Sequence, residues 1–168
     1  MIDSSNNKDL DISNSEIIKN VLISLINVAS SKTSNDYAWA AIKKMLRELK
    51  TSYSFLNFID IGDISFLKYS IEDISVSCDF DRLKPMQVGI VIQELIDLFK
   101  KYLGIKAGYF FIEEFKNVLG EEYCYIIKKL GVDLRLIELQ KELHGLEIKD
   151  YKIKESTDSN IVFVEKIK

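Results

Sequence analysis

The chain has 168 residues, of which 47% are hydrophobic and 29% charged, and its formal net charge is −3. This composition is that of a globular protein, and the length allows one domain with its own core. The weak acidity gives no bulk attraction to nucleic acid or anionic lipid, and two cysteines are too few for a disulfide framework. Without a secretion signal, a membrane span or a recognisable cofactor motif, we expect a cytoplasmic protein that has no cofactor and no membrane association.

The N-terminal region begins with a polar stretch and continues into a helical pattern. Residues 1–12 have the composition of a disordered lead, and we expect residues 13–168 to form a single domain. Ser13 or Ser15 can cap a first helix that ends near Ser30. Its apolar residues come in pairs at helical spacing, namely Ile17/Ile18, Val21/Leu22 and Leu25/Ile26.

A second helix follows, which Ser34 or Asn35 can cap. Its apolar residues share one face: Ala38, Ala41, Ile42, Met45, Leu46 and Leu49. Trp39 lies outside that face. Two interpretations stay open for it, namely packing on a neighbouring element or serving as an exposed anchor for a protein partner.

The segment from about residue 54 to residue 80 changes to an alternating pattern. Residues 55–61, 66–71 and 74–80 are rich in aromatic and β-branched side chains, and turn residues separate them. We therefore predict a three-stranded antiparallel meander, whose middle strand could instead form a short helix. In the last strand Cys78 alternates with apolar residues, which indicates a core position.

A long helix is predicted over residues 84–103, with Pro85 in its first turn. Apolar residues surround most of its circumference, which is typical of a helix buried in a core or against a partner. We expect it to be the central helix of the domain, and this apolar girth also suggests a homodimer interface.

Glycines divide the remaining helical segments. Gly104 to Gly108 predict a helix stop, and short helices are expected to close at Gly120, Gly131 and Gly145. The tail, 151–167, has the pattern of a β-hairpin. Because strands and helices are segregated along the chain, the predicted fold class is α+β: two N-terminal helices, the meander, the central helix, short helical hairpins and the C-terminal hairpin.

Carboxylates around the last predicted strand allow a metal-site hypothesis. Asp79 and Asp81 form a D-x-D pattern, and two residues of a strand that are two apart share a face. The competing interpretation is a capped junction between a strand and a helix, where acidic residues are favoured. An enzyme would use these two residues, with Glu113 or Glu114 as further candidates.

An aromatic cluster after the central helix allows a ligand-site hypothesis. Tyr109, Phe110, Phe111 and Phe115 could line a pocket for a small apolar or planar ligand. The helical spacing of the two last residues is more often that of a core.

Residues 123–143 resemble a helix-turn-helix in outline, with a turn at Leu130-Gly131-Val132. Ile127 is large for such a turn, and Gln140 is polar where an apolar residue is usual. The second helix has no net positive charge to meet phosphate, so a nucleic-acid partner is disfavoured.

Two remaining residues of chemical interest have structural interpretations. His144, the only histidine, would lie at a helix C-terminus, where an imidazolium suits the helix dipole. Cys124 follows two glutamates that discourage its thiolate, and no basic partner is near in sequence.

The pattern as a whole predicts a non-enzymatic cytosolic module with a regulatory, sensor or protein-interaction role. The expected partner is a second copy of the chain or another protein, with a small apolar ligand as a further possibility. A DNA-binding regulator that uses residues 123–143 and a carboxylate-based enzyme are the alternatives.

Overall fold

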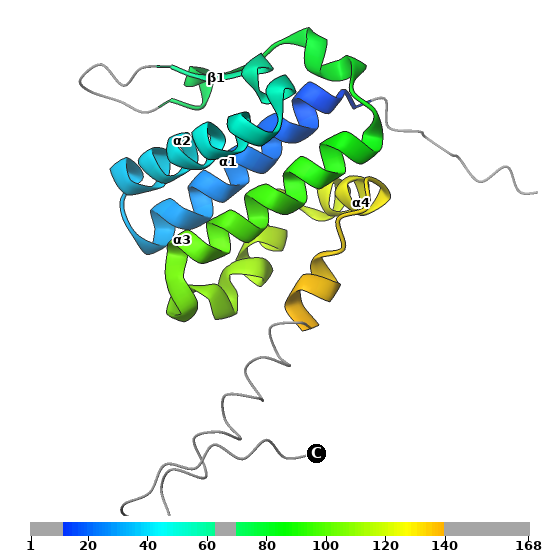
Figure 1. Cartoon of the computed structure of the whole chain (residues 1–168). Coiled ribbons are helices and arrows are strands. Elements are labelled where there is room, and N and C mark those ends of the chain that lie inside the picture. The colour runs from blue at the N-terminus through cyan, green and yellow to red at the C-terminus, as the bar shows by residue number, and fades with distance from the viewer. Residues whose placement is uncertain (1–11, 63–69, 140–168) are drawn as a thin grey trace, which may run out of the picture. The chain divides into compact units, whose positions relative to one another are not determined.

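Helices make up most of the described chain, and the predicted α+β class is therefore wrong. The structure, a computed structural model, describes residues 12–62 and 70–139, and for 104–110 it describes the backbone alone (Figure 1). A two-stranded sheet is the β-structure within these ranges. The chain divides into two compact units, residues 1–132 and 133–168, and α1 to α4 belong to the first unit.

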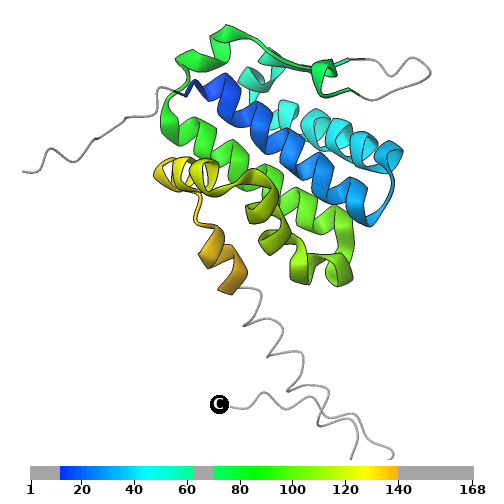
Figure 2. The same ribbon diagram turned by 180° about the vertical axis from the view of Figure 1, so that it is seen from behind.

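Helix α1, Asn14–Lys32, is the central helix of the first unit. Ser13 caps it by accepting a hydrogen bond from the backbone of Glu16, as predicted. The helix packs against α2 on one side and α3 on the other (Figures 1 and 2). Its buried residues therefore cover more than half of its circumference: Ile17, Ile18, Val21, Leu22, Ser24, Leu25, Ile26, Val28 and Ala29.

Helix α2, Asn35–Ser52, confirms the second predicted helix. The hydroxyl of Ser34 accepts the N–H of Tyr37 and caps its first turn. The predicted apolar face is buried, and Trp39 is buried beside it. Opposite this face α2 carries basic residues, among them Lys43, Arg47 and Lys50.

The predicted three-stranded meander is wrong. Strands β1, Ile59–Ile61, and β2, Ile74–Val76, form an antiparallel pair in which Asp60 lies opposite Ser75. The segments on either side of these strands adopt 3-10 turns instead of extended backbone: η1, Ser54–Phe58, η2, Ile71–Asp73, and η3, Cys78–Arg82. Residues 63–69, which include most of the predicted middle strand, lie outside the described residues.

The turn η3 explains why Cys78 is exposed rather than in the core. The strand ends at Val76, and the Ser77 hydroxyl accepts the N–H of Asp79 and starts the turn. Alternation of side chains therefore ceases two residues before Cys78, and Phe80 is the residue of this turn that is buried.

Helix α3, Pro85–Leu119, begins at the predicted proline but continues far beyond the predicted end. The predicted stop at Gly104 to Gly108 is wrong, because the backbone of these residues is helical. The buried residues in its first half lie toward α1, whereas Met86 and Ile90 are exposed. The predicted central position thus belongs to α1 and not to this helix.

Helix α3 nevertheless bends sharply. The rings of Phe99 and Phe111 lie 5.4 Å apart between centroids. In a straight helix twelve residues would separate them by about 18 Å, at 1.5 Å per residue. The helix must therefore turn back between them, and its ribbon changes direction in the lime-coloured part of Figure 1. Glycines are among the residues at which helices kink, so Gly104 and Gly108 mark a bend rather than an end.

Helix α4, Glu121–Lys129, closes the first unit. Gly131 follows it at a φ of 96°. The N–H of Gly131 donates to the Lys128 carbonyl at 3.0 Å, and the N–H of Val132 donates to the Ile127 carbonyl at 3.0 Å. These two bonds form a Schellman motif, which fixes the direction of the chain after the helix.

The second unit is described over residues 133–139. The Asp133 carboxylate accepts the N–H of Arg135 at 2.9 Å and caps a helix over 134–139. The expected disordered lead, residues 1–12, lies outside the described residues except for Ile12, and so do His144 and the C-terminal hairpin (151–167). The single domain over 13–168 stays a prediction. None of the described helices combines the length and the apolar character needed to cross a membrane.

Candidate functional site

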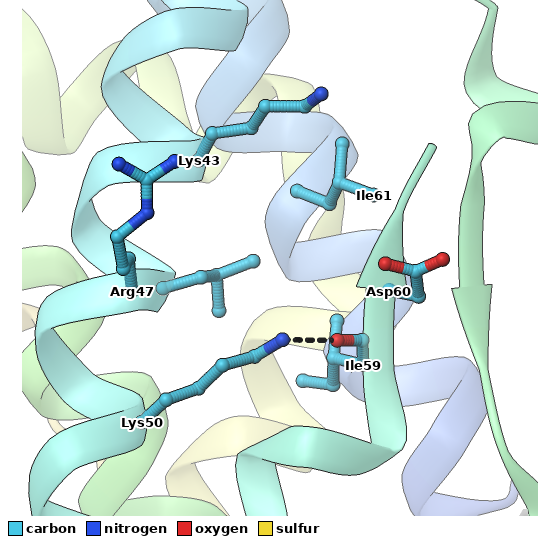
Figure 3. Close-up of a pocket in the computed structure, with 7 residues that line it drawn as sticks. Lys43, Arg47, Lys50, Ile59, Asp60 and Ile61 are labelled. Atoms are coloured by element: carbon cyan, nitrogen blue, oxygen red, sulfur yellow. Dashed lines mark hydrogen bonds between the residues drawn. The ribbon is translucent and has the colours of Figure 1, made fainter. Parts of the chain in front are cut away.

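A basic cleft lies between α2 and β1 (Figure 3). Its volume is about 180 Å³, and among the residues that line it three are cationic and one is acidic: Lys43, Leu46, Arg47, Lys50, Ile59, Asp60 and Ile61. We call this the α2–β1 cleft. The chain as a whole is acidic, with a net charge of −3, so the cleft is a local reversal of charge.

The three cations come from one side of α2. Residues three and four apart on a helix are neighbours, and Arg47 is four residues after Lys43 and three before Lys50. Figure 3 shows Lys43 and Lys50 extending toward β1, with Arg47 between them along the helix. The opposite face of α2 is buried against the core, so this basic side is held in place by packing.

The two lysines attach β1 and the residue that follows it to α2. Lys50 Nζ donates to the carbonyl of Ile59 at 2.9 Å, and Lys43 Nζ donates to the carbonyl of Gly62 at 2.6 Å. An ammonium group has three N–H donors, so the bond to Ile59 leaves Lys50 with further donors. The cleft is therefore closed on one side by backbone and keeps its positive charge.

The strand register gives the cleft another donor. Gly62 donates its N–H to Asp73 on the β2 side, and Phe58 accepts from Ser77 on the same side. Residues of a strand alternate in the edge toward which their N–H and C=O point, so Ile61 presents both groups to the edge near α2. The bond from Lys50 to Ile59 lies on this same edge.

Arg47 is exposed and has no ion pair or hydrogen bond within the described residues. A guanidinium offers five N–H donors in a planar arrangement that matches a carboxylate or phosphate. Leu46 and Ile59 lie beneath the cleft and are buried. The arrangement can bind a compact anionic group.

Comparison with protein-family models, curated proteins and solved structures finds no match.

The predicted aromatic ligand site is part of the core where it is described. Phe111 and Phe115 are 1% and 0% exposed, and their rings stack with centroids 5.9 Å apart. Phe99 contacts Phe111 from the first half of α3. Tyr109 and Phe110 lie where only the backbone is described. Phe111 and Phe115 thus hold the bend of α3 together and are not open to a ligand.

Trp39 is 4% exposed, so the interpretation as packing on a neighbouring element fits the structure. Its indole has no exposed face with which to anchor a partner, and the basic side of α2 offers the accessible groups instead.

The two candidate metal ligands each have a structural partner. Asp79 pairs with Arg82 at 3.2 Å, within the turn η3. Asp81 accepts the N–H of Ser15 at 2.7 Å and so caps the start of α1. Across residues 12–62 and 70–139, no three potential metal ligands gather into a cluster.

Glu113, Glu114 and Cys124 are the remaining candidates. Glu114 pairs with Lys32 at 2.6 Å, and Glu113 is exposed on the same helix. Cys124 is partly buried, and its Sγ donates to the Lys116 carbonyl at 3.7 Å. Burial raises the pKa of this thiol, which disfavours a thiolate nucleophile.

The helix-turn-helix hypothesis spans the boundary between the two units. Its first helix is α4 in the first unit, and its second begins after Asp133 in the second. Residues 140–143 lie outside the described residues. The hypothesis stays a prediction.

The α2–β1 cleft was not predicted from the sequence. The signal for it is the spacing of Lys43, Arg47 and Lys50 at i, i+4 and i+7, which places three cations on one side of a helix. Solvent-facing helices commonly carry such charges, and the opposing strand edge that turns them into a cleft is visible only in the structure.

Proposed function

We propose that the chain is a non-enzymatic protein-interaction module and that its α2–β1 cleft binds an acidic side chain of a partner protein. Arg47 carries the proposal, because it is an exposed guanidinium in a cleft with no partner among the described residues. A bidentate pair between arginine and a carboxylate supplies both attraction and a defined orientation.

The size of the cleft favours a side chain over a nucleic-acid backbone. A volume of about 180 Å³ has room for one carboxylate-bearing side chain. Binding to nucleic acid depends on a series of cations that follow many phosphates. The net charge of −3 works against such a polyanion, whereas a single carboxylate feels mainly the nearby cations.

The test uses a capped peptide of alternating glutamate and leucine, with a glutamine–leucine peptide as its neutral control. Amide chemical shifts of the labelled protein follow the titration. We expect the glutamate peptide to shift the signals of residues 43–50 and 59–62, and added salt to weaken the effect. The glutamine peptide should leave those signals in place.

Arg47→Glu should abolish the shifts, because it replaces the anchoring cation with a like charge. Arg82→Glu is the matched control, since Arg82 is exposed, lies outside the cleft and undergoes the same change of charge. Equal shifts with both peptides, or retained binding in Arg47→Glu, would contradict the proposal. A stronger response of the same signals to inorganic phosphate would replace the acidic protein with a small oxyanion as the ligand.

A further inference from the structure

The α2–β1 cleft contains a carboxylate as well as its three cations. Asp60 lies at the centre of β1 and is the acidic residue among those that line the cleft. Figure 3 shows Asp60 on β1, across the cleft from the basic side chains on α2. The cleft is therefore bipolar, with positive charge on its helix side and one negative charge on its strand side.

The carboxylate of Asp60 has no partner within residues 12–62 and 70–139. It forms neither a hydrogen bond nor an ion pair there, and the residue is exposed. Lys43 and Lys50, which line the same cleft, donate to the backbone carbonyls of Gly62 and Ile59 instead. The cations of α2 thus leave Asp60 accessible to a ligand.

The position of Asp60 is unusual for its residue type. Aspartate is depleted in strands, partly because its short side chain competes for backbone hydrogen bonds. Asp60 makes no such bond, and its neighbour across the strand pair is the uncharged Ser75. No interaction among the described residues therefore accounts for this carboxylate, which favours a role in binding.

The two kinds of charge are close enough for one short segment to meet both. Arg47 and Asp60 line the same cleft of about 180 Å³. Residues two apart on an extended segment share a face and lie about 7 Å from each other. Because acidic and basic side chains are long and flexible, an acidic residue and a basic residue at this spacing can reach Arg47 and Asp60 together.

We infer that the ligand of the α2–β1 cleft is a bipolar segment of a partner protein, in which a basic side chain pairs with Asp60 while the acidic side chain pairs with Arg47. This inference rests on the proposed function, and it adds that Asp60 selects among acidic segments. A segment with acidic residues alone meets repulsion from Asp60, whereas a neighbouring lysine gains attraction from it.

The test compares two capped peptides that differ in one residue. Both place a glutamate between leucines, and two positions later one carries lysine and the other glutamine. Amide chemical shifts of residues 43–50 and 59–62 report the binding of each peptide. We expect the lysine peptide to bind about threefold more tightly, as is typical of one exposed ion pair. A second pair of peptides with the charges in reverse order covers both chain directions.

Asp60→Asn separates a binding role from a structural one. The variant should bind the lysine peptide more weakly, because an ion pair is lost. It should bind the glutamine peptide more tightly, because a like charge near the glutamate is removed. Asp60→Glu keeps the charge and should keep the preference of the parent protein.

Asp36→Asn is the matched control. Asp36 is exposed in the first turn of α2 and does not line the cleft, so this variant should keep the preference for the lysine peptide. Affinities that change in the same direction for both peptides in Asp60→Asn would overturn the inference and leave the proposed function in place. Equal affinities of the parent protein for both peptides, in both orders, would also overturn it. If neither peptide shifts the signals of the cleft, the proposed function fails and the inference fails with it.

Discussion

The backbone carbonyl of Leu130 occupies the place where a side chain of Gly89 would begin. A Cβ atom added to Gly89 would overlap the carbonyl oxygen and would lie 2.9 Å from the carbonyl carbon. The Schellman motif after α4 fixes this part of the backbone, and Gly89 lies within α3, so neither side can give way easily. Glycine at this position therefore lets the end of α4 approach α3 closely.

Gly89→Ala should lower the free energy of unfolding by about 2 kcal/mol, as is typical when an atom is forced into a packed contact. Alanine is the better helix former, so the expected loss runs against intrinsic propensity. Urea denaturation measures the change. Ile90→Ala, one residue along on the exposed side, should stay within about 0.5 kcal/mol of the parent protein. A Gly89→Ala protein as stable as the parent would show that the two segments separate readily.

A second contact between helices makes stability depend on pH. The Tyr123 hydroxyl on α4 donates to the Glu16 carboxylate on α1 at 2.9 Å and accepts from Asn20 at 2.9 Å. Burial, and then the bond to Glu16, raise the pKa of Tyr123 from 10.0 to about 12. Folding thus favours the neutral phenol, and its contribution is fully present below pH 10 and is lost between pH 10 and about 12.

Tyr123→Phe should remove this dependence. We expect the absorbance titration of the parent protein to contain a tyrosinate phase near pH 12 that the variant lacks. The unfolding free energy of the parent should also fall more steeply above pH 10 than that of the variant. Coincident titration curves would mean that Tyr123 ionises like a tyrosine in water.

The two cysteines should react at different rates with a thiol reagent. Cys78 is exposed, whereas burial raises the pKa of the Cys124 thiol and lowers its thiolate fraction. We expect a fast phase that Cys78→Ser removes and a phase several times slower that Cys124→Ser removes. A single rate for both cysteines in the folded protein would contradict the difference in burial.

Local capping explains why the start of each N-terminal helix could be predicted. Ser13 and Ser34 each accept a backbone N–H from the residue three positions later, an interaction that depends on nearby sequence alone. Pro85 at the start of α3 is likewise a local signal. None of these features depends on a distant part of the chain.

The sequence predicts longer and more numerous strands than the structure has. The reason is that alternation of apolar and polar residues also fits 3-10 turns that bury occasional side chains. Phe80 is buried from the turn η3, and Leu56 is buried from the turn η1. The serine hydroxyl of Ser77 starts η3 and ends the extended backbone. Such competition between side-chain and backbone hydrogen bonds is hard to recognise from periodicity alone.

The central helix and the cleft depend on how distant elements meet. The sequences of α1 and α3 both predict a helix with a broad apolar surface, so neither stands out as the central one. Only the packing shows that α1 has neighbours on more sides. Arg47 likewise belongs to a cleft only because the edge of β1 lies opposite its helix. The sequence predicts which faces are apolar or basic, and tertiary structure decides which of them are covered.

The central position of α1 has a consequence for biosynthesis. The ribosome makes α1 before α2 and α3, yet its apolar surface is covered by both, and its first turn bonds to Asp81. While the chain is being made, α1 can pair with α2 but must wait for α3 with part of its apolar surface facing water. During that interval the nascent chain is a target for chaperones and for association with neighbouring nascent chains.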